Sequence, residues 1–210
     1  MSYLLIALSF TPFYLIGTIP TGYIIAKSAG VDISKHGSGN VGATNIGRVL
    51  GKKAGILTLL IDIGKGAIAV GLALLLNVGL WYSATAAFAV VLGHCISLPP
   101  LLKGGKGVAT SLGALIALTP ITALGVVVIF SSVFAWRRTV SLASISAAIC
   151  APLIAIFCGL PDQILYGIIP MATTLVIRHK DNLKRLALGT EPRTELKSSA
   201  TPSPDQGTKD

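Results

Sequence analysis

The chain has 210 residues, of which 52% are hydrophobic and 12% are charged, and its formal net charge is +9 at pH 7. Soluble domains carry about 25% charged residues, so this composition excludes an ordinary soluble domain and predicts several membrane helices. A nucleic-acid partner is not expected, because the sequence holds no soluble basic domain or recognised motif. Anionic lipids and anionic small molecules are the remaining partners for the positive charge.

Apolar stretches follow one another along the chain, and each predicts a helix at membrane level. They are Tyr3–Ala26, Gly55–Leu76, Trp81–Leu98, Val108–Leu118, Ile121–Ala135, Val140–Phe157 and Gln163–Ile177. The first has neither the charged start nor the cleavage site of a signal peptide, so we expect it to be retained. Val108–Leu118 is too short to cross alone, and we interpret it as a half-helix that starts inside the protein.

Basic residues are distributed unevenly between these stretches. They follow the first, third, fifth and last stretches, whereas the alternate connections contain no Lys or Arg. Since cytoplasmic loops are rich in Lys and Arg, these segments are assigned to the cytoplasm. We therefore predict an all-α, polytopic protein of the bacterial inner membrane, with about seven spans, the N-terminus outside and the C-terminus cytoplasmic. Residues 1–195 would form one membrane domain, and the polar residues 196–210 a disordered tail.

Three polar segments interrupt this apolar chain. Loop one is Gly37–Arg48 (GSGNVGATNIGR), loop two is Lys103–Thr110 (KGGKGVAT), and the third segment is His179–Glu195. Irregular polar backbone survives at membrane level only where protein buries it or water reaches it. All three segments fall on the predicted cytoplasmic side, so we expect the functional site where they meet.

The residues of these segments suit anions. Loop two, with the start of Val108–Leu118, combines glycine N–H groups, Lys106 and a helix N-terminus. Loop one adds Arg48, whose guanidinium can hold a phosphate through two hydrogen bonds. His179 and Asn182 are three residues apart and share a face if the segment is helical. A histidine titrates near neutral pH, as a general base must.

Two nucleotide-binding patterns are disfavoured by their context. Gly37, Gly39 and Gly42 match G-x-G-x-x-G, but no strand precedes them and no βαβ unit follows. Lys106 stands in a P-loop-like run, but Gly107 occupies the place where a P-loop has Ser or Thr. No Cys or His cluster has metal-ligand spacing, so we expect no metal site.

The chain resembles the bacterial membrane glycerol-3-phosphate acyltransferases that use acyl phosphate as donor. The resemblance extends from Met1 to about Glu195 and is carried by SGNVGATNIGR (Ser38–Arg48), GGKGVAT (Gly104–Thr110) and HKDNLKRLALGTE (His179–Glu191). It implies transfer of a fatty acyl group from acyl phosphate to the sn-1 hydroxyl of glycerol 3-phosphate, which gives lysophosphatidic acid and phosphate. It also implies that the enzyme uses no cofactor and makes the first intermediate of phospholipid synthesis. We expect a monomer surrounded by membrane lipids.

Carried over by motif, Ser38 and Arg48 are essential polar contacts and the Gly104–Thr110 loop binds glycerol 3-phosphate. His179 and Asn182 assist the chemistry, and Glu191 supports the structure. The residues themselves add candidates, because a site for two phosphates needs cations to offset their repulsion and hydrogen-bonding groups to orient them. The full catalytic set is Ser38, Arg48, Lys106, His179 and Asn182. The substrate-binding set is Asn40, Thr44, Asn45, Gly104, Gly105, Gly107, Thr110, Ser141 and Arg185.

Three alternatives stay open. The proton of the acceptor hydroxyl goes either to His179 or to a substrate phosphate. Asp62 and Lys65, three residues apart in an apolar stretch, are either a structural ion pair or functional intramembrane charges. A transporter of an anionic solute is the rival function, against which stand the one-sided polar loops and the lack of internal repeats.

Overall fold

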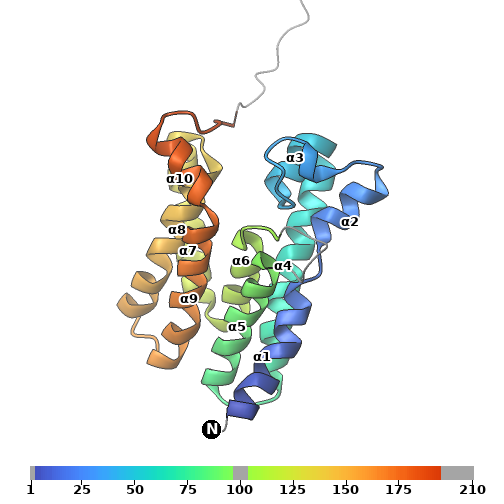
Figure 1. Cartoon of the computed structure of the whole chain (residues 1–210). Coiled ribbons are helices and arrows are strands. Elements are labelled where there is room, and N and C mark those ends of the chain that lie inside the picture. The colour runs from blue at the N-terminus through green and yellow to red at the C-terminus, as the bar shows by residue number, and fades with distance from the viewer. Residues whose placement is uncertain (1–2, 97–103, 195–210) are drawn as a thin grey trace, which may run out of the picture.

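A computed structural model describes residues 3–96 and 104–194, and every regular element in these ranges is helical (Figure 1). The all-α prediction is therefore confirmed for the described part of the chain. The elements are α1 (Tyr3–Gly17), α2 (Thr21–Ser28), the short 3-10 helix η1 (Ile33–Lys35), α3 (Ala43–Leu50), α4 (Lys52–Leu75), α5 (Leu80–Cys95), α6 (Val108–Leu118), α7 (Pro120–Arg137), α8 (Val140–Phe157), α9 (Asp162–Arg178) and α10 (Lys180–Ala187).

The first apolar stretch, Tyr3–Ala26, is not the single helix that its sequence predicts. α1 ends at Gly17 and α2 begins at Thr21. Pro20 causes the break, because it has no N–H group and its ring disfavours helical backbone at the residue before it. That residue is Ile19, whose carbonyl oxygen accepts a hydrogen bond from a distant lysine side chain.

The helices approach one another closely at glycines. A Cβ atom at Gly113 of α6 would overlap the carbonyl oxygen of Ile63 in α4, and one at Gly17 of α1 would overlap that of Val90 in α5. Small residues at crossings let membrane helices pack closely, and this packing drives their association because lipid provides no hydrophobic effect between them. The close α4–α6 contact matters for function because loop two leads directly into α6.

Large apolar side chains cover the outer surface of the helices. Leu60 and Leu75 of α4, Leu124 of α7 and Leu153 and Phe157 of α8 are all more than half exposed. In the described residues three helices, α4, α7 and α8, are long and apolar enough to cross a membrane, and α5 and α6 are shorter apolar helices. Seven spans and the orientation of the ends stay predictions.

The polar segments lie at one end of the molecule. Figure 1 places α3, which holds the second half of loop one, and α10, which lies in the third segment, at the end far from the N-terminus. The start of α6, where loop two ends, lies between the two groups of helices. The tail from residue 195 onward and Lys103 of loop two fall outside the described residues.

The α4–α6 crossing can be tested by adding one methyl group. Gly113→Ala is expected to lower the free energy of unfolding by about 1–3 kcal/mol, because the Cβ overlaps the Ile63 carbonyl. Gly71→Ala in α4 is the matched control: its Cβ meets no atom within 4 Å, so stability is expected to rise by about 0.5–1 kcal/mol. Denaturant titrations in mixed micelles measure both, and equal stabilities would contradict the close crossing.

Candidate functional site

One buried side chain shapes loop one. Asn45 of α3 is 2% exposed, and its Oδ1 accepts a hydrogen bond from the backbone N–H of Ser38 at 2.9 Å. Its Nδ2 donates to the carbonyl oxygens of His36 and Asn40. Asn40 in turn accepts, through Oδ1, a hydrogen bond from the N–H of Gly42 at the start of α3. Both asparagines are predicted substrate contacts, and in the structure they hold the loop backbone.

Gly37 is required by this arrangement. It has φ of +60°, and a Cβ atom there would overlap the Asn45 side-chain oxygen. Loop one therefore folds around the Asn45 amide because a glycine leaves room for it.

Loop one leaves three of its predicted site residues unpartnered. Ser38, Thr44 and Arg48 are exposed, and their side chains form no hydrogen bond or ion pair with other described residues. Thr44 and Arg48 are four residues apart in α3 and so lie on one face of that helix. A hydroxyl pair and a guanidinium on an open surface are free to bind an anionic ligand.

Loop two is fixed between two helices. The N–H of Gly105 donates to the carbonyl of His94 in α5 at 3.0 Å. From the opposite side Arg178, at the end of α9, donates from Nε to the carbonyl of Gly105 and from Nη2 to that of Gly104. Arg178 is absent from the predicted site; its place directly before His179, at the end of an apolar stretch, was the only signal for it.

The glycines of loop two are needed for this packing. A Cβ atom at Gly104 would overlap the carbonyl of Cys95, and one at Gly105 would overlap the imidazole of His94. Gly107, at the start of α6, has φ of +83°, which disfavours any other residue. All three are predicted substrate-binding residues, and close packing against α5 accounts for them independently of any ligand.

Lys106 joins loop two to the third segment. Its Nζ donates to Oδ1 of Asn182 at 2.5 Å, and the Nδ2 of Asn182 donates to Oε1 of Glu191 at 2.6 Å. Partial burial lowers the pKa of Lys106, although the nearby charge of Glu191 opposes this effect. Loop two and the third segment, which we expect to meet, are thus in direct contact at this pair.

Glu191 is the centre of a polar network. Besides Asn182, it accepts hydrogen bonds from the Ser141 hydroxyl at the start of α8 and from Nε of Arg185 at 2.7 Å. Burial alone raises the pKa of Glu191, but the three hydrogen bonds outweigh burial and lower it. The network supports the structural role predicted for Glu191 and engages two predicted substrate contacts, Ser141 and Arg185.

A backbone carbonyl engages one ring nitrogen of His179. The residue is 2% exposed, and its Nδ1 lies 2.8 Å from the carbonyl oxygen of Leu175. A carbonyl can only accept, so Nδ1 carries the proton of the neutral ring and Nε2 is left as the acceptor. Burial lowers the pKa of His179 to about 4, with a further contribution from the charge of Lys106.

Two buried hydroxyls follow loop two. Thr110 and Ser111, in the first turn of α6, are 0% and 6% exposed, and neither side-chain oxygen has a hydrogen-bond partner among the described residues. Thr110 is a predicted substrate contact, whereas Ser111 was not singled out in the sequence. Its position one residue beyond the glycine-rich motif was the available signal.

The three polar segments are joined unequally. The hydrogen bond from Lys106 to Asn182 connects loop two with the third segment, and those from Arg178 connect loop two with the end of α9, directly before that segment. Loop one lies at the same end of the molecule (Figure 1), but no hydrogen bond or ion pair within residues 3–96 and 104–194 joins it to the other two. In these ranges no cluster of His, Cys, Asp and Glu could hold a metal ion.

Neutralising the centre of the network is expected to destabilise the protein. In Glu191→Gln one charged acceptor of three hydrogen bonds is lost, which should cost about 1–3 kcal/mol in unfolding free energy. Asp181→Asn, an exposed carboxyl in the first turn of α10, is the matched control and should change it by less than about 0.5 kcal/mol. Denaturant titration compares them; a silent Glu191→Gln would show that the network contributes nothing to stability.

The protonation state of His179 can be followed directly. We expect the ring to stay neutral down to about pH 5, since its folded-state pKa is about 4. The unfolded chain binds the proton at about pH 6.5, so stability should fall as the pH drops from about 6.5 to about 4. Imidazole nitrogen shifts of labelled protein, assigned with His179→Gln, measure the titration; a midpoint near 6.5 for the folded protein would refute the buried, neutral ring.

Comparisons of the sequence with known proteins identify the family. Residues 7–189 match the family described as glycerol-3-phosphate acyltransferase. The glycerol-3-phosphate acyltransferase of Trichlorobacter lovleyi is 44% identical over 178 residues, which cover 85% of this chain and 92% of that protein. The one from Aquifex aeolicus is 42% identical over 181 residues, covering 86% and 94%.

Two solved structures have the same fold. Both are of PlsY, an integral membrane glycerol 3-phosphate acyltransferase, in its glycerol 3-phosphate form and its lysophosphatidic acid form. Their TM-scores are 0.85 and 0.83 at 41% identity, and each alignment covers 90% of this chain and at least 95% of the other. The chain described here therefore belongs to the family of integral membrane glycerol-3-phosphate acyltransferases.

Proposed function

We propose that this protein transfers a fatty acyl group from acyl phosphate to the sn-1 hydroxyl of glycerol 3-phosphate. Family membership supports the acceptor, since the solved relatives are in glycerol 3-phosphate and lysophosphatidic acid forms. The motifs Ser38–Arg48, Gly104–Thr110 and His179–Glu191 support acyl phosphate as the donor, through the resemblance that they carry. The products are lysophosphatidic acid and inorganic phosphate.

The observation that carries the proposal is the contact between Lys106 and Asn182. It brings a cation of loop two against the third segment, one turn from His179, while Arg48 of loop one has no partner among the described residues. Two cations on separate segments suit a reaction that must bring two phosphates together. Arg185, by contrast, is neutralised by Glu191 at 2.7 Å, so it contributes less free charge to a ligand.

The reaction needs no covalent enzyme intermediate. An acyl phosphate is already activated: the acceptor oxygen forms a bond to the carbonyl carbon, and the bond from that carbon to the phosphate oxygen breaks. Hydrogen-bond donors beside the carbonyl stabilise the oxyanion of the tetrahedral intermediate. Ser38 and the ammonium of Lys106 are the donors that we assign to the donor substrate.

A substrate phosphate is the better proton acceptor. The pKa of His179 is lowered to about 4, so the ring is a weak base, whereas a phosphate monoester has its second pKa at about 6. General base catalysis is most efficient when the pKa of the base lies near the working pH. We propose that Nε2 of His179 accepts the hydrogen bond that orients the acceptor hydroxyl and that the proton passes to a phosphate.

We propose further that the protein is a monomer of the bacterial inner membrane with its site on the cytoplasmic face. The basic segments support this orientation through the positive-inside rule. Seven spans would place loop one, loop two and the third segment together on that face, in a membrane domain of residues 1–195 that needs no cofactor.

A metal-free transfer assay tests the function. Purified protein in detergent, given palmitoyl phosphate and glycerol 3-phosphate with a chelator present, is expected to release lysophosphatidic acid and phosphate in equal amounts. Palmitoyl-CoA serves as the control donor and should give no product. Failure of folded protein to form product would refute the proposal and favour anion transport, which flux into liposomes would then measure.

A substitution at Arg48 tests whether its guanidinium binds a substrate phosphate. Arg48→Lys keeps the charge but loses the two-pronged hydrogen bond to a phosphate, and kcat/KM is expected to fall about a hundredfold. Lys52→Ala, which removes an exposed cation at the start of α4, is the matched control and should act like the unaltered chain. Equal losses in both would mean that only the general positive charge of this region is used.

A further inference from the structure

We propose that Lys65, with Asp62 and His94, is a positioning group that fixes the position of loop one relative to loop two. None of the three belongs to the motifs or touches the proposed substrate contacts Arg48 or Lys106. The kinetic part of the inference rests on the proposed acyl transfer, and its structural part does not.

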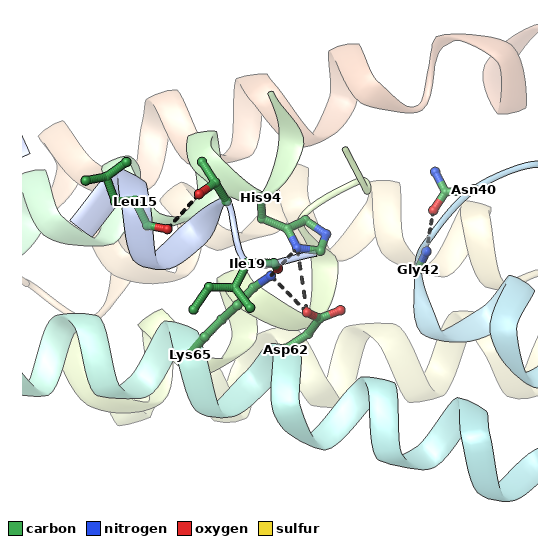
Figure 2. A network of polar contacts seen from close by, with 8 residues as sticks. Leu15, Ile19, Asn40, Gly42, Asp62, Lys65 and His94 are labelled. Atoms are coloured by element: carbon green, nitrogen blue, oxygen red, sulfur yellow. Dashed lines mark hydrogen bonds and ion pairs between the residues drawn. The ribbon is translucent and has the colours of Figure 1, made fainter. Parts of the chain in front are cut away.

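Figure 2 shows these side chains meeting between three elements. The ammonium of Lys65 in α4 lies 2.9 Å from Oδ1 of Asp62, one turn earlier. It also lies 3.0 Å from the carbonyl oxygen of Ile19, in the break between α1 and α2, and 2.7 Å from Nδ1 of His94 in α5. The ammonium thus forms an ion pair with Asp62 and hydrogen bonds with Ile19 and His94, which belong to two other elements.

Burying these charged side chains costs free energy of folding. The side chains of Lys65 and Asp62 are 5% and 3% exposed, and that of His94 is 8% exposed. An apolar pair of similar volume in such a place is often as stable as a buried ion pair. Ions inside a membrane helix therefore point to a role beyond stability.

The junction controls loop two through His94. Because Nδ1 accepts from the lysine, the ring proton lies on Nε2, and this edge of the ring faces Gly105, where a Cβ atom would overlap it. The carbonyl of His94 also accepts the N–H of Gly105 at 3.0 Å. A rotation of the His94 ring would thus displace the residue immediately before Lys106.

The junction controls loop one through the helix break. Ile19 is followed by Pro20 and then by α2, whose Gly22 packs so closely on loop one that a Cβ atom would overlap the carbonyl of Val41. Val41 directly follows Asn40, whose Oδ1 accepts the N–H of Gly42 immediately before α3. One ammonium therefore holds the backbone leading to loop one and the ring supporting loop two, two segments that no described hydrogen bond joins.

The test replaces the ion pair by apolar side chains. Asp62→Leu/Lys65→Met removes both charges together, so no unpaired ion is left in the core. We expect kcat/KM for glycerol 3-phosphate to fall about tenfold to a hundredfold. Thr122→Val, at the start of α7, is the matched control, because it removes a buried hydroxyl that lies 3.0 Å from the hydroxyl of Thr119. The stability of this variant should fall while its kcat and KM stay unchanged.

His94 gives a second pair of variants should the double variant not fold. Asn places a side-chain oxygen near the position of Nδ1, so His94→Asn can still accept from Lys65, whereas His94→Leu cannot. We expect His94→Asn to retain several-fold more activity than His94→Leu at similar stability. Equal activities would overturn the role given to the Lys65–His94 contact.

Hydrogen–deuterium exchange tests the inference without reference to activity. In the double variant, or in His94→Leu, backbone exchange should rise together in residues 37–45 and 104–110, while α7 and α8 keep their protection. Unchanged exchange in both loops, or an equal rise in all helices, would overturn the proposal. If the unaltered chain transfers no acyl group, the proposed function fails, and the exchange result still decides whether the junction positions the loops.

Discussion

The site depends on how a glycine-rich loop is held at membrane level. Irregular polar backbone at membrane level needs hydrogen-bond partners from the protein, because lipid offers none. One backbone carbonyl and one side chain from neighbouring helices bind this backbone: the His94 carbonyl accepts from Gly105, and Arg178 donates to the carbonyls of Gly104 and Gly105. Because these contacts come from α5 and α9, the packing of the helix bundle sets the position of Lys106.

The charges of the site are divided between structure and ligand. Glu191 neutralises Arg185 in an ion pair and, through Asn182, offsets part of the charge of Lys106. Arg48 has no such partner among the described residues and is exposed. An enzyme for two phosphates needs cations that are positioned but not neutralised, and this division leaves Arg48 as the freest of them.

The helices, the three polar segments and the family were predictable from the sequence, because apolar run length and motif order carry that information. Two physical facts were not. The break at Pro20 was hidden in a continuous apolar stretch, and Arg178 resembled an ordinary interface cation. Asn45 was predicted as a substrate contact, yet its amide holds the loop backbone. Sequence cannot separate these roles, since folding a polar loop and binding a polar ligand need the same hydrogen-bonding groups.

Loop one poses the remaining structural question of how it keeps its place opposite loop two. Its own hydrogen bonds are local, from Asn40 and Asn45, and its exposed face is committed to no other segment. What fixes it must therefore act through the helices beneath, α2 and α4. The ammonium of Lys65 is at the point where α4, α5 and the break before α2 meet, so the inference proposed above assigns the spacing of loop one and loop two to a buried charge outside the three motifs.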